Sequence, residues 1–187
     1  MPMRRFPLPK DANYSYANRF GTGPGDHHGT DIFAPRGTPV LAVERGMARS
    51  DEDPKGGLVV YLAAINLEGG PAEPIRIYYY AHLDDVIDTV PGGTLVEPGA
   101  VLGHVGDSGN ARGTDPHLHF QARVGGETVN PYPLLRTVDP KVPGPGKEPI
   151  DLRSGPEDPK LVMGLGVLAV AALAWLLWPR RRRRASG

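Results

Sequence analysis

Histidine is the residue of this 187-residue sequence most able to do chemistry, and five of the six histidines lie in three short motifs. The first motif reads HHGTD at residues 27–31, so that His27 and Asp31 stand four positions apart around a glycine. A loop that folds back at Gly29 would aim both side chains at one ion. This motif therefore supplies a candidate pair of metal ligands.

The other two motifs belong to segments with the character of strands. YAHL occupies residues 80–83 after a run of tyrosines, and PHLHF occupies residues 116–120. Side chains two apart on a strand share a face, so His117 and His119 point the same way while Leu118 points to the other face. Each motif alone is weak, because isolated histidines are often structural. The joint occurrence of all three is much more specific.

Two histidines and a carboxylate with an open fourth position form a known catalytic zinc arrangement. Such a metal polarises a carbonyl and lowers the pKa of water to about 7, which produces a nucleophile at neutral pH. Further histidines nearby would move protons or stabilise an oxyanion. Because the sequence contains no cysteine, thiolate metal sites and disulfides are excluded.

The elements that position these motifs are expected to be short strands. The chain contains 25 glycines and 21 prolines, a composition that suits many tight turns. Segments rich in β-branched and aromatic residues, each bounded by glycine or proline, predict strands. These segments are residues 39–43, 47–49, 58–64, 75–81, 101–105 and 117–124. We therefore expect an all-β domain, mainly an antiparallel sandwich.

Residues from about 13 to 136 resemble the lysostaphin-type, or LytM-type, zinc endopeptidases. The matching segments are HHGTDIFAPRGTPVLAVERGMA, YYAHL, VEPGAVLGHVGDSGNARGTDPHLHFQ and NPYPLL. The resemblance implies a mainly antiparallel β fold with an open active-site groove. It also implies hydrolysis of peptide bonds in the stem peptides or cross-bridges of peptidoglycan.

The same resemblance implies roles for individual residues. The first histidine and the aspartate of HxxxD, with the second histidine of HxH, hold one zinc ion per domain, and here they are His27, Asp31 and His119. The histidine of YAHL and the first histidine of HxH line the reaction site, and here they are His82 and His117. No other cofactor is expected.

Four further residues near the motifs have weaker claims. The family spacing selects the first histidine of the HH pair, so His28 is not expected to be a ligand. His104, within GHVGDSG, is expected at the surface or at the edge of the groove. Asp115 stands where relatives often have glycine or proline, and it either orients a histidine or caps a turn. Tyr80 either packs in the core or assists an oxyanion.

Beyond the domain the composition changes. We divide the chain into an N-terminal arm, a zinc metallopeptidase domain, a Pro/Gly-rich linker, a transmembrane helix and a basic tail. As a helix, the 18 uncharged residues of the fourth segment would span about 27 Å, close to the roughly 30 Å hydrocarbon core of a bilayer. The five segments are residues 1–12, 13–137, 138–160, 161–178 and 179–187.

The charge distribution limits the partners. The formal net charge is zero, but five of the 21 basic residues are the arginines at 180–184. Without them, 16 basic residues face 21 acidic ones, and the body of the protein is mildly acidic. Nucleic-acid binding is not expected. The expected partners are peptidoglycan peptides and, through residues 161–178, a lipid bilayer. The oligomeric state stays open.

Two other functions compete with the active hydrolase. A catalytically inactive member of the same fold would bind cell wall or activate an amidase, but such relatives usually lose metal ligands, and all five site positions are present here. A carrier-like β domain is the other alternative, since VEPGAVLGHVG is similar to the hairpins of biotinyl and lipoyl carriers. Those hairpins need a lysine at the tip, and Lys55 lies outside that segment.

The orientation in the membrane is predicted from the arginines at 180–184, which favour the cytoplasmic side and would place the catalytic domain on the cell-envelope side. Residues 1–10 do not read as a secretory signal. An upstream start, a C-terminal sorting signal, or a cytosolic enzyme released by lysis would each explain this.

We expect a tag placed before Asn13 to be digested by protease added to intact spheroplasts, because the domain then lies outside the membrane. A cytoplasmic protein assayed in parallel controls for lysis. Protection of the tag until the membrane is broken would overturn this orientation.

Overall fold

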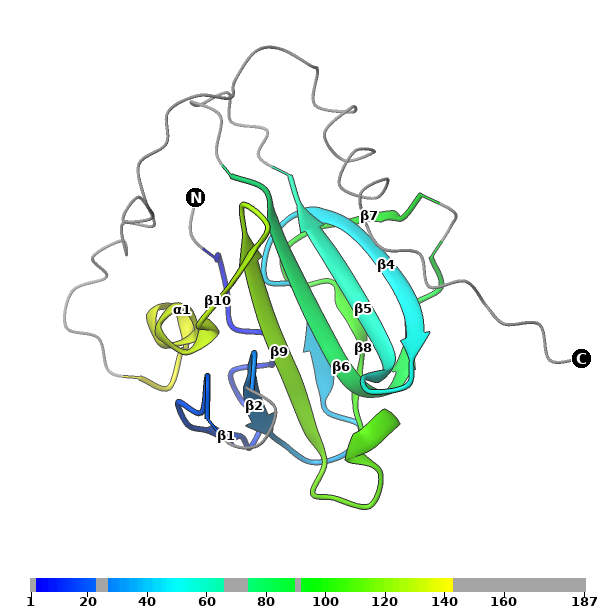
Figure 1. Ribbon diagram of the computed structural model, residues 1–187, viewed down its shortest axis with the longest axis vertical. Coiled ribbons are helices and arrows are strands. Elements are labelled where there is room, and N and C mark those ends of the chain that lie inside the picture. The colour runs from blue at the N-terminus through cyan, green and yellow to red at the C-terminus, as the bar shows by residue number, and fades with distance from the viewer. Residues whose placement is uncertain (1–2, 23–26, 66–73, 90–91, 143–187) are drawn as a thin grey trace, which may run out of the picture.

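The computed structural model describes residues 3–22, 27–65, 74–89 and 92–142 (Figure 1). Ten strands carry almost all of the regular structure, together with the 3₁₀ turn η1 (Gly109–Ala111) and the helix α1 (Pro131–Val138). The strands are β1 (Ser15–Tyr16), β2 (Thr30–Phe33), β3 (Pro39–Leu41), β4 (Gly46–Asp53), β5 (Gly57–Ala64), β6 (Arg76–Val86), β7 (Thr94–Val96), β8 (Val101–Val105), β9 (His117–Val124) and β10 (Glu127–Val129).

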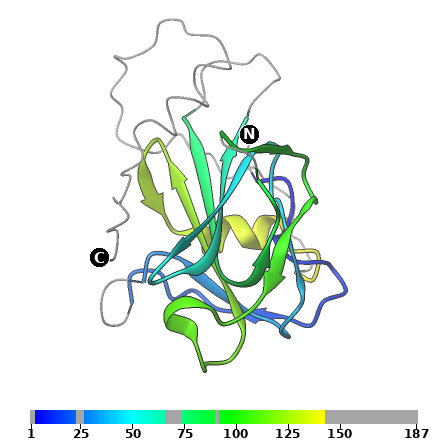
Figure 2. The same cartoon turned by 90° about the vertical axis from the view of Figure 1, so that its right-hand side faces the viewer.

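All strand pairs are antiparallel, and the main path through the sheet runs β1-β2-β9-β6-β5-β4-β7. The long strand β6 connects two parts of the sheet. Its first half pairs with β5 and β9, and its second half bends away to pair with β8, which in turn pairs with β3. The turned view shows β8 lying apart from the broad sheet (Figure 2). The core fills the space between these two parts.

Alternation along β9 separates the core from the opposite face of the sheet. Leu118, Phe120 and Ala122 are fully or almost fully buried in the hydrophobic core. The residues between them, including His117 and His119, face the other way and line a hollow. The strand therefore contributes one face to stability and the other to the candidate site.

The segment at the N-terminus is part of this core. Met3, Phe6 and Leu8 are each at most 3% exposed and belong to the main hydrophobic cluster. The backbone of the segment runs beside β3, where the N–H of Leu41 donates to the carbonyl of Pro7 at 2.8 Å. Residues 3–8 of the expected arm are thus packed against the sheet rather than separate from it.

Asp139, which follows α1, ties this helix to strand β1 and to the residue before it, Tyr14. This buried carboxylate accepts hydrogen bonds from the hydroxyls of Tyr14, at 2.6 Å, and Tyr16, at 2.7 Å. The helix begins conventionally, with the Asn130 side chain accepting from the N–H of Tyr132. The hydrogen bonds of Asp139 thus join the end of α1 to the N-terminal part of the chain.

The expectation of a mainly antiparallel β fold is confirmed. Strands were expected at 101–105 and 117–124, and β8 and β9 have these bounds. The sequence did not predict β1, β2, β7, β10 or α1. No helix among the described residues is long and apolar enough to cross a membrane. The expected linker from residue 143 on, the transmembrane segment 161–178 and the basic tail lie outside the described residues, and the proposed domain limits stay predictions.

We expect Leu8→Ala to lower the free energy of unfolding by about 2–5 kcal/mol, because it removes a fully buried side chain from the core. Urea unfolding followed by circular dichroism measures the loss. Lys10→Ala is the matched control, since Lys10 is exposed. Equal stability of the two variants would show that the N-terminal segment does not belong to the folded unit.

Candidate active site

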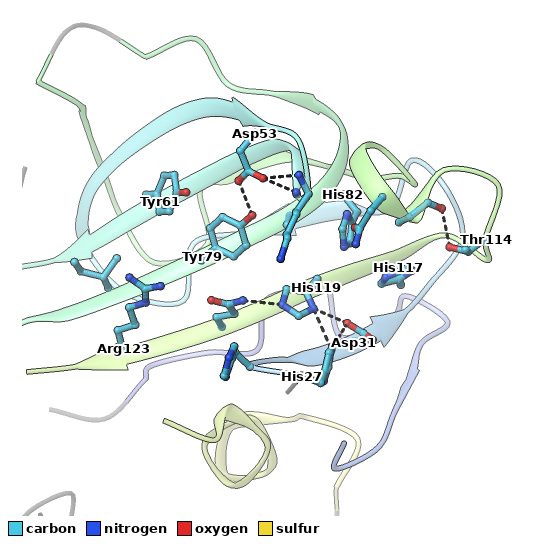
Figure 3. A pocket seen from close by; sticks show the side chains of 18 residues that line it. His27, Asp31, Asp53, Tyr61, Tyr79, His82, Thr114, His117, His119 and Arg123 are labelled. Carbon is cyan, nitrogen blue, oxygen red and sulfur yellow. Dashed lines mark hydrogen bonds and ion pairs between the residues drawn. The ribbon is translucent and has the colours of Figure 1, made fainter. Parts of the chain in front are cut away.

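The pairing of β2 with β9 brings the first and third motifs together. Asp31 lies directly opposite His119 in the antiparallel register. The His119 Nδ1 atom is 2.7 Å from Asp31 Oδ1, across 88 residues of chain. His27, from the loop before β2, places its Nε2 atom 3.1 Å from the same oxygen and 3.2 Å from His119 Nδ1. Three ligand-type atoms thus converge on one point (Figure 3).

Gly29 permits this convergence. A Cβ atom at residue 29 would lie 2.7 Å from ring atoms of His119 and from the carbonyl oxygen of Phe120, closer than real Cβ atoms approach. The loop between His27 and Asp31 can therefore pass over the histidine ring only because residue 29 has no side chain. The backbone at Gly29 thus lies directly against the ring of His119.

The three residues fit a divalent metal. Their ligand atoms all lie within 4.8 Å of one another. Atoms bound about 2.0–2.1 Å from one tetrahedral zinc would lie roughly 3.3 Å apart, which is close to the spacing found here. Burial alone would raise the pKa of Asp31, but the hydrogen bond with His119 and the nearby histidines hold it well below its usual value. The carboxylate is thus ionised and ready to bind a cation.

His82 reaches the site through an irregularity in β6. The register between β5 and β6 shifts between Leu58 and Val60, where β6 carries an extra residue. His82 has a φ of 65°, the only positive value among the non-glycine residues that the structure describes. The side chain of His82 therefore lines the hollow together with that of Ala81, although neighbouring side chains on a regular strand face opposite ways.

Backbone carbonyls orient His82 and His117. The Nδ1 atom of His82 lies 2.9 Å from the carbonyl oxygen of Ser108, and that of His117 lies 2.8 Å from the carbonyl oxygen of Asp115. Since a carbonyl only accepts, each Nδ1 carries a proton and each Nε2 keeps its lone pair when the ring is neutral. The two ring centroids are 5.0 Å apart, so both side chains reach the same part of the hollow.

Burial, and after it the neighbouring His117, lowers the pKa of His82 to about 4. The ordinary value for histidine is 6.5, so His82 is neutral at pH 7 and stays neutral into the acidic range. A neutral imidazole can accept a proton. The side chain is thus in the form that a general base requires.

The site lies in a hollow of about 630 Å³ on the exposed face of the sheet. Strand β9 lines its floor with alternate residues, His117, His119, Gln121 and Arg123, and β6 and β5 add Tyr79 and Tyr61. Figure 3 shows the histidines toward one end of this floor and Arg123 with Tyr61 toward the other. The hollow therefore extends well beyond the candidate metal ligands.

The weaker candidates of the sequence take different places. His28 lines the hollow but is not part of the group of three ligands. His104 is partly exposed and pairs with Asp85 at 2.8 Å, outside the hollow. Asp115 is exposed and orients His117 through its backbone carbonyl, not its carboxylate. Tyr80 is fully buried, which supports core packing over an oxyanion role.

Sequence reasoning missed the rest of the hollow. The amide nitrogen of Gln121 lies 2.9 Å from the Nε2 atom of His119, and Tyr79 donates from its hydroxyl to Asp53 at 2.9 Å. The spacing of two that groups His117 with His119 continues to Gln121 and Arg123, and this signal was available in the sequence. No comparable signal pointed to Asp53, which arrives from the end of β4.

A two-histidine, one-aspartate ligand set beside two oriented histidines, in a hollow on an antiparallel sheet, defines the class of metallopeptidase-like sites. Comparison with known proteins agrees. Residues 25–131 match the family model described as peptidase family M23, which is more than half of the chain. This protein belongs to peptidase family M23, and the resemblance indicated by the motifs is confirmed.

Three similar proteins illustrate the relationship. The L-Ala--D-Glu endopeptidase of Bacillus subtilis is 36% identical over 150 residues, and the match spans 70% of this chain and 42% of that protein. The catalytic domain of lysostaphin from Staphylococcus simulans has 30% identity and a TM-score of 0.55, over 66% of this chain and 92% of that domain. A zinc-containing peptidase from Vibrio cholerae has 25% identity and a TM-score of 0.54, over 69% and 39% of the two chains.

We expect Asp31→Ala to abolish stoichiometric metal binding, because it removes the carboxylate on which both ligand histidines converge. Metal content of the purified protein after dialysis against zinc, measured by mass spectrometry, gives the result. His27→Ala should also lose metal, whereas the matched control His28→Ala should keep it. Metal loss in the His28 variant, with retention in the His27 variant, would show that the ligand assignment is wrong.

Proposed function

We propose that this protein is a zinc-dependent endopeptidase that hydrolyses peptide bonds in the stem peptides or cross-bridges of peptidoglycan. The observation that carries the proposal is the convergence of His27, Asp31 and His119 beside His82 and His117, whose Nδ1 atoms are held by backbone carbonyls. Membership of peptidase family M23 supports the reaction type. The names of similar proteins, which include an L-Ala--D-Glu endopeptidase, support the substrate class.

His27, Asp31 and His119 would hold the zinc ion, which when bound supplies Lewis acidity for the scissile carbonyl and for water. The remaining work falls to His82 and His117. Through its Nε2 lone pair, one of them accepts a proton from the attacking water. The other, when it carries a proton on Nε2 as well as on Nδ1, donates a hydrogen bond to the oxygen on which negative charge develops. The protonated histidine then returns its proton to the leaving amine, so no net proton is consumed within the site.

The carbonyls of Ser108 and Asp115 make this exchange effective. Each holds one imidazole in a single orientation and tautomer through Nδ1, so Nε2 always faces the hollow. An imidazolium formed during turnover is also stabilised, because Nδ1–H continues to donate to a carbonyl oxygen. Positioning of this kind reduces the reorganisation that the reaction would otherwise require.

An inactive, cell-wall-binding relative of the same fold is the alternative that the sequence left open. The complete set of five positions and the orientation of the two free histidines favour catalysis over binding alone. We further propose that residues 161–178 tether the protein to a membrane with the catalytic domain on the cell-envelope side, where peptidoglycan lies.

We expect His117→Ala and His82→Asn to reduce turnover by about 10²–10⁴-fold while leaving metal content unchanged, because each removes a proton-transfer or oxyanion group but no ligand. Asparagine suits position 82, since it tolerates positive φ. The assay is release of soluble peptides from purified peptidoglycan, identified by mass spectrometry, with and without a chelator.

His104→Ala is the control for removal of a histidine outside the hollow, and it should keep full activity. Full activity in the His117 or His82 variant would exclude that residue from catalysis. Hydrolysis that persists in the presence of the chelator would refute a zinc-dependent reaction.

A further inference from the structure

The floor of the hollow continues past the metal ligands to Arg123. Residues 117, 119, 121 and 123 are alternate positions of β9, so all four side chains lie on the same face. Arg123 is thus fixed on the same rigid strand as the ligand His119. The part of the hollow around Arg123 takes no part in the proposed catalysis.

The spacing along β9 defines a distance from the reaction centre. Same-face residues on a strand are about 6.6 Å apart, so the Cα atoms of His119 and Arg123 are about 13 Å apart. An extended peptide covers that length with about four residues. Allowing for the length of the arginine side chain, its guanidinium meets a peptide roughly two to four residues from the bond that is cut.

Arg123 lies among phenolic side chains at this end of the hollow. It is half-buried and lies beside Tyr61 and Tyr79, whose rings are 5.0 Å apart (Figure 3). Burial and the carboxylate of Asp53 raise the pKa values of both hydroxyls, and the positive charge of Arg123 lowers them by less. Asp53 also lines this side of the hollow, and its carboxylate already accepts from Tyr79 and from the backbone N–H groups of the β4–β5 turn. An incoming carboxylate therefore meets a fixed cation flanked by two phenols.

We propose that Arg123, with Tyr61 beside it, forms a subsite for a carboxylate of the peptide substrate, two to four residues from the cut bond. The proposal rests on the proposed function and narrows it to peptides that carry free carboxylates in preference to uncharged ones. Guanidinium and carboxylate form paired, charge-assisted hydrogen bonds, which lysine cannot reproduce. Arg123 is a residue for substrate selection and takes no part in bond cleavage.

Binding of an uncleaved peptide to the metal-depleted full-length protein tests the subsite without requiring hydrolysis. Isothermal titration calorimetry would compare two soluble stem peptides of one sequence, the first with all carboxylates free and the second with all of them amidated. We expect the wild type to bind the free-acid peptide at least about tenfold more tightly than the amidated peptide, because amidation removes a charge-assisted hydrogen bond to Arg123. Arg123→Gln should remove this preference, and Arg123→Lys should keep only part of it.

Arg136→Gln is the matched control, because Arg136 is exposed on α1 and its loss changes the net charge equally. It should keep the wild-type preference. Equal binding of the two peptides by the wild type, no binding of either, or a preserved preference in Arg123→Gln would each overturn the subsite. Failure of zinc-dependent hydrolysis would instead refute the proposed function and leave the binding preference intact.

Discussion

The antiparallel pairing of β2 with β9 is the constraint on which the site depends. It sets Asp31 opposite His119, and that single register unites two motifs separated by most of the domain. A shift of one residue would turn either side chain toward the core, where Leu118 and Phe120 now lie. The apolar face of β9 therefore enforces the register, because any slip would bury histidines and expose core residues. The geometry of the candidate metal site is in this way a consequence of packing.

The sequence predicts much of this arrangement, and the position of His82, which it does not predict, has a physical explanation. The alternation of HLHF predicts both the shared face of its histidines and the apolar face behind them. The same rule applied to β6 would send His82 to the core, since Tyr78 and Tyr80 are both buried. An extra residue in β6 and the positive φ of His82 reverse its direction. A histidine in left-handed conformation has no local signature, so family resemblance, and not periodicity, identified it.

Hydrophobic periodicity also failed to predict the short strand β2 and the packing of the N-terminal segment. β2 is only four residues long and follows a loop, and its pairing partner lies far along the chain. The N-terminal segment carries Met3, Phe6 and Leu8 at irregular spacing between prolines, so neither helical nor strand periodicity marks it as core. Such segments are ordered by the surface that they cover. The secondary-structure propensity of the segment's own residues therefore does not predict that it is buried.

The groove walls are built differently from its floor. The β4–β5 turn and the loop that carries Ser108 meet at Gly57 and Gly109, where a Cβ on Gly57 would come within 2.3 Å of the Gly109 nitrogen and of the Ser108 hydroxyl. The Ser108 hydroxyl accepts from the N–H of Leu58, and its carbonyl orients His82. Contact between two loops thus directly holds the side chain of His82. Because Asp31 and His119 stand on paired strands while these walls are loops, the walls can vary and change the shape of the hollow, provided that the contact holding His82 survives.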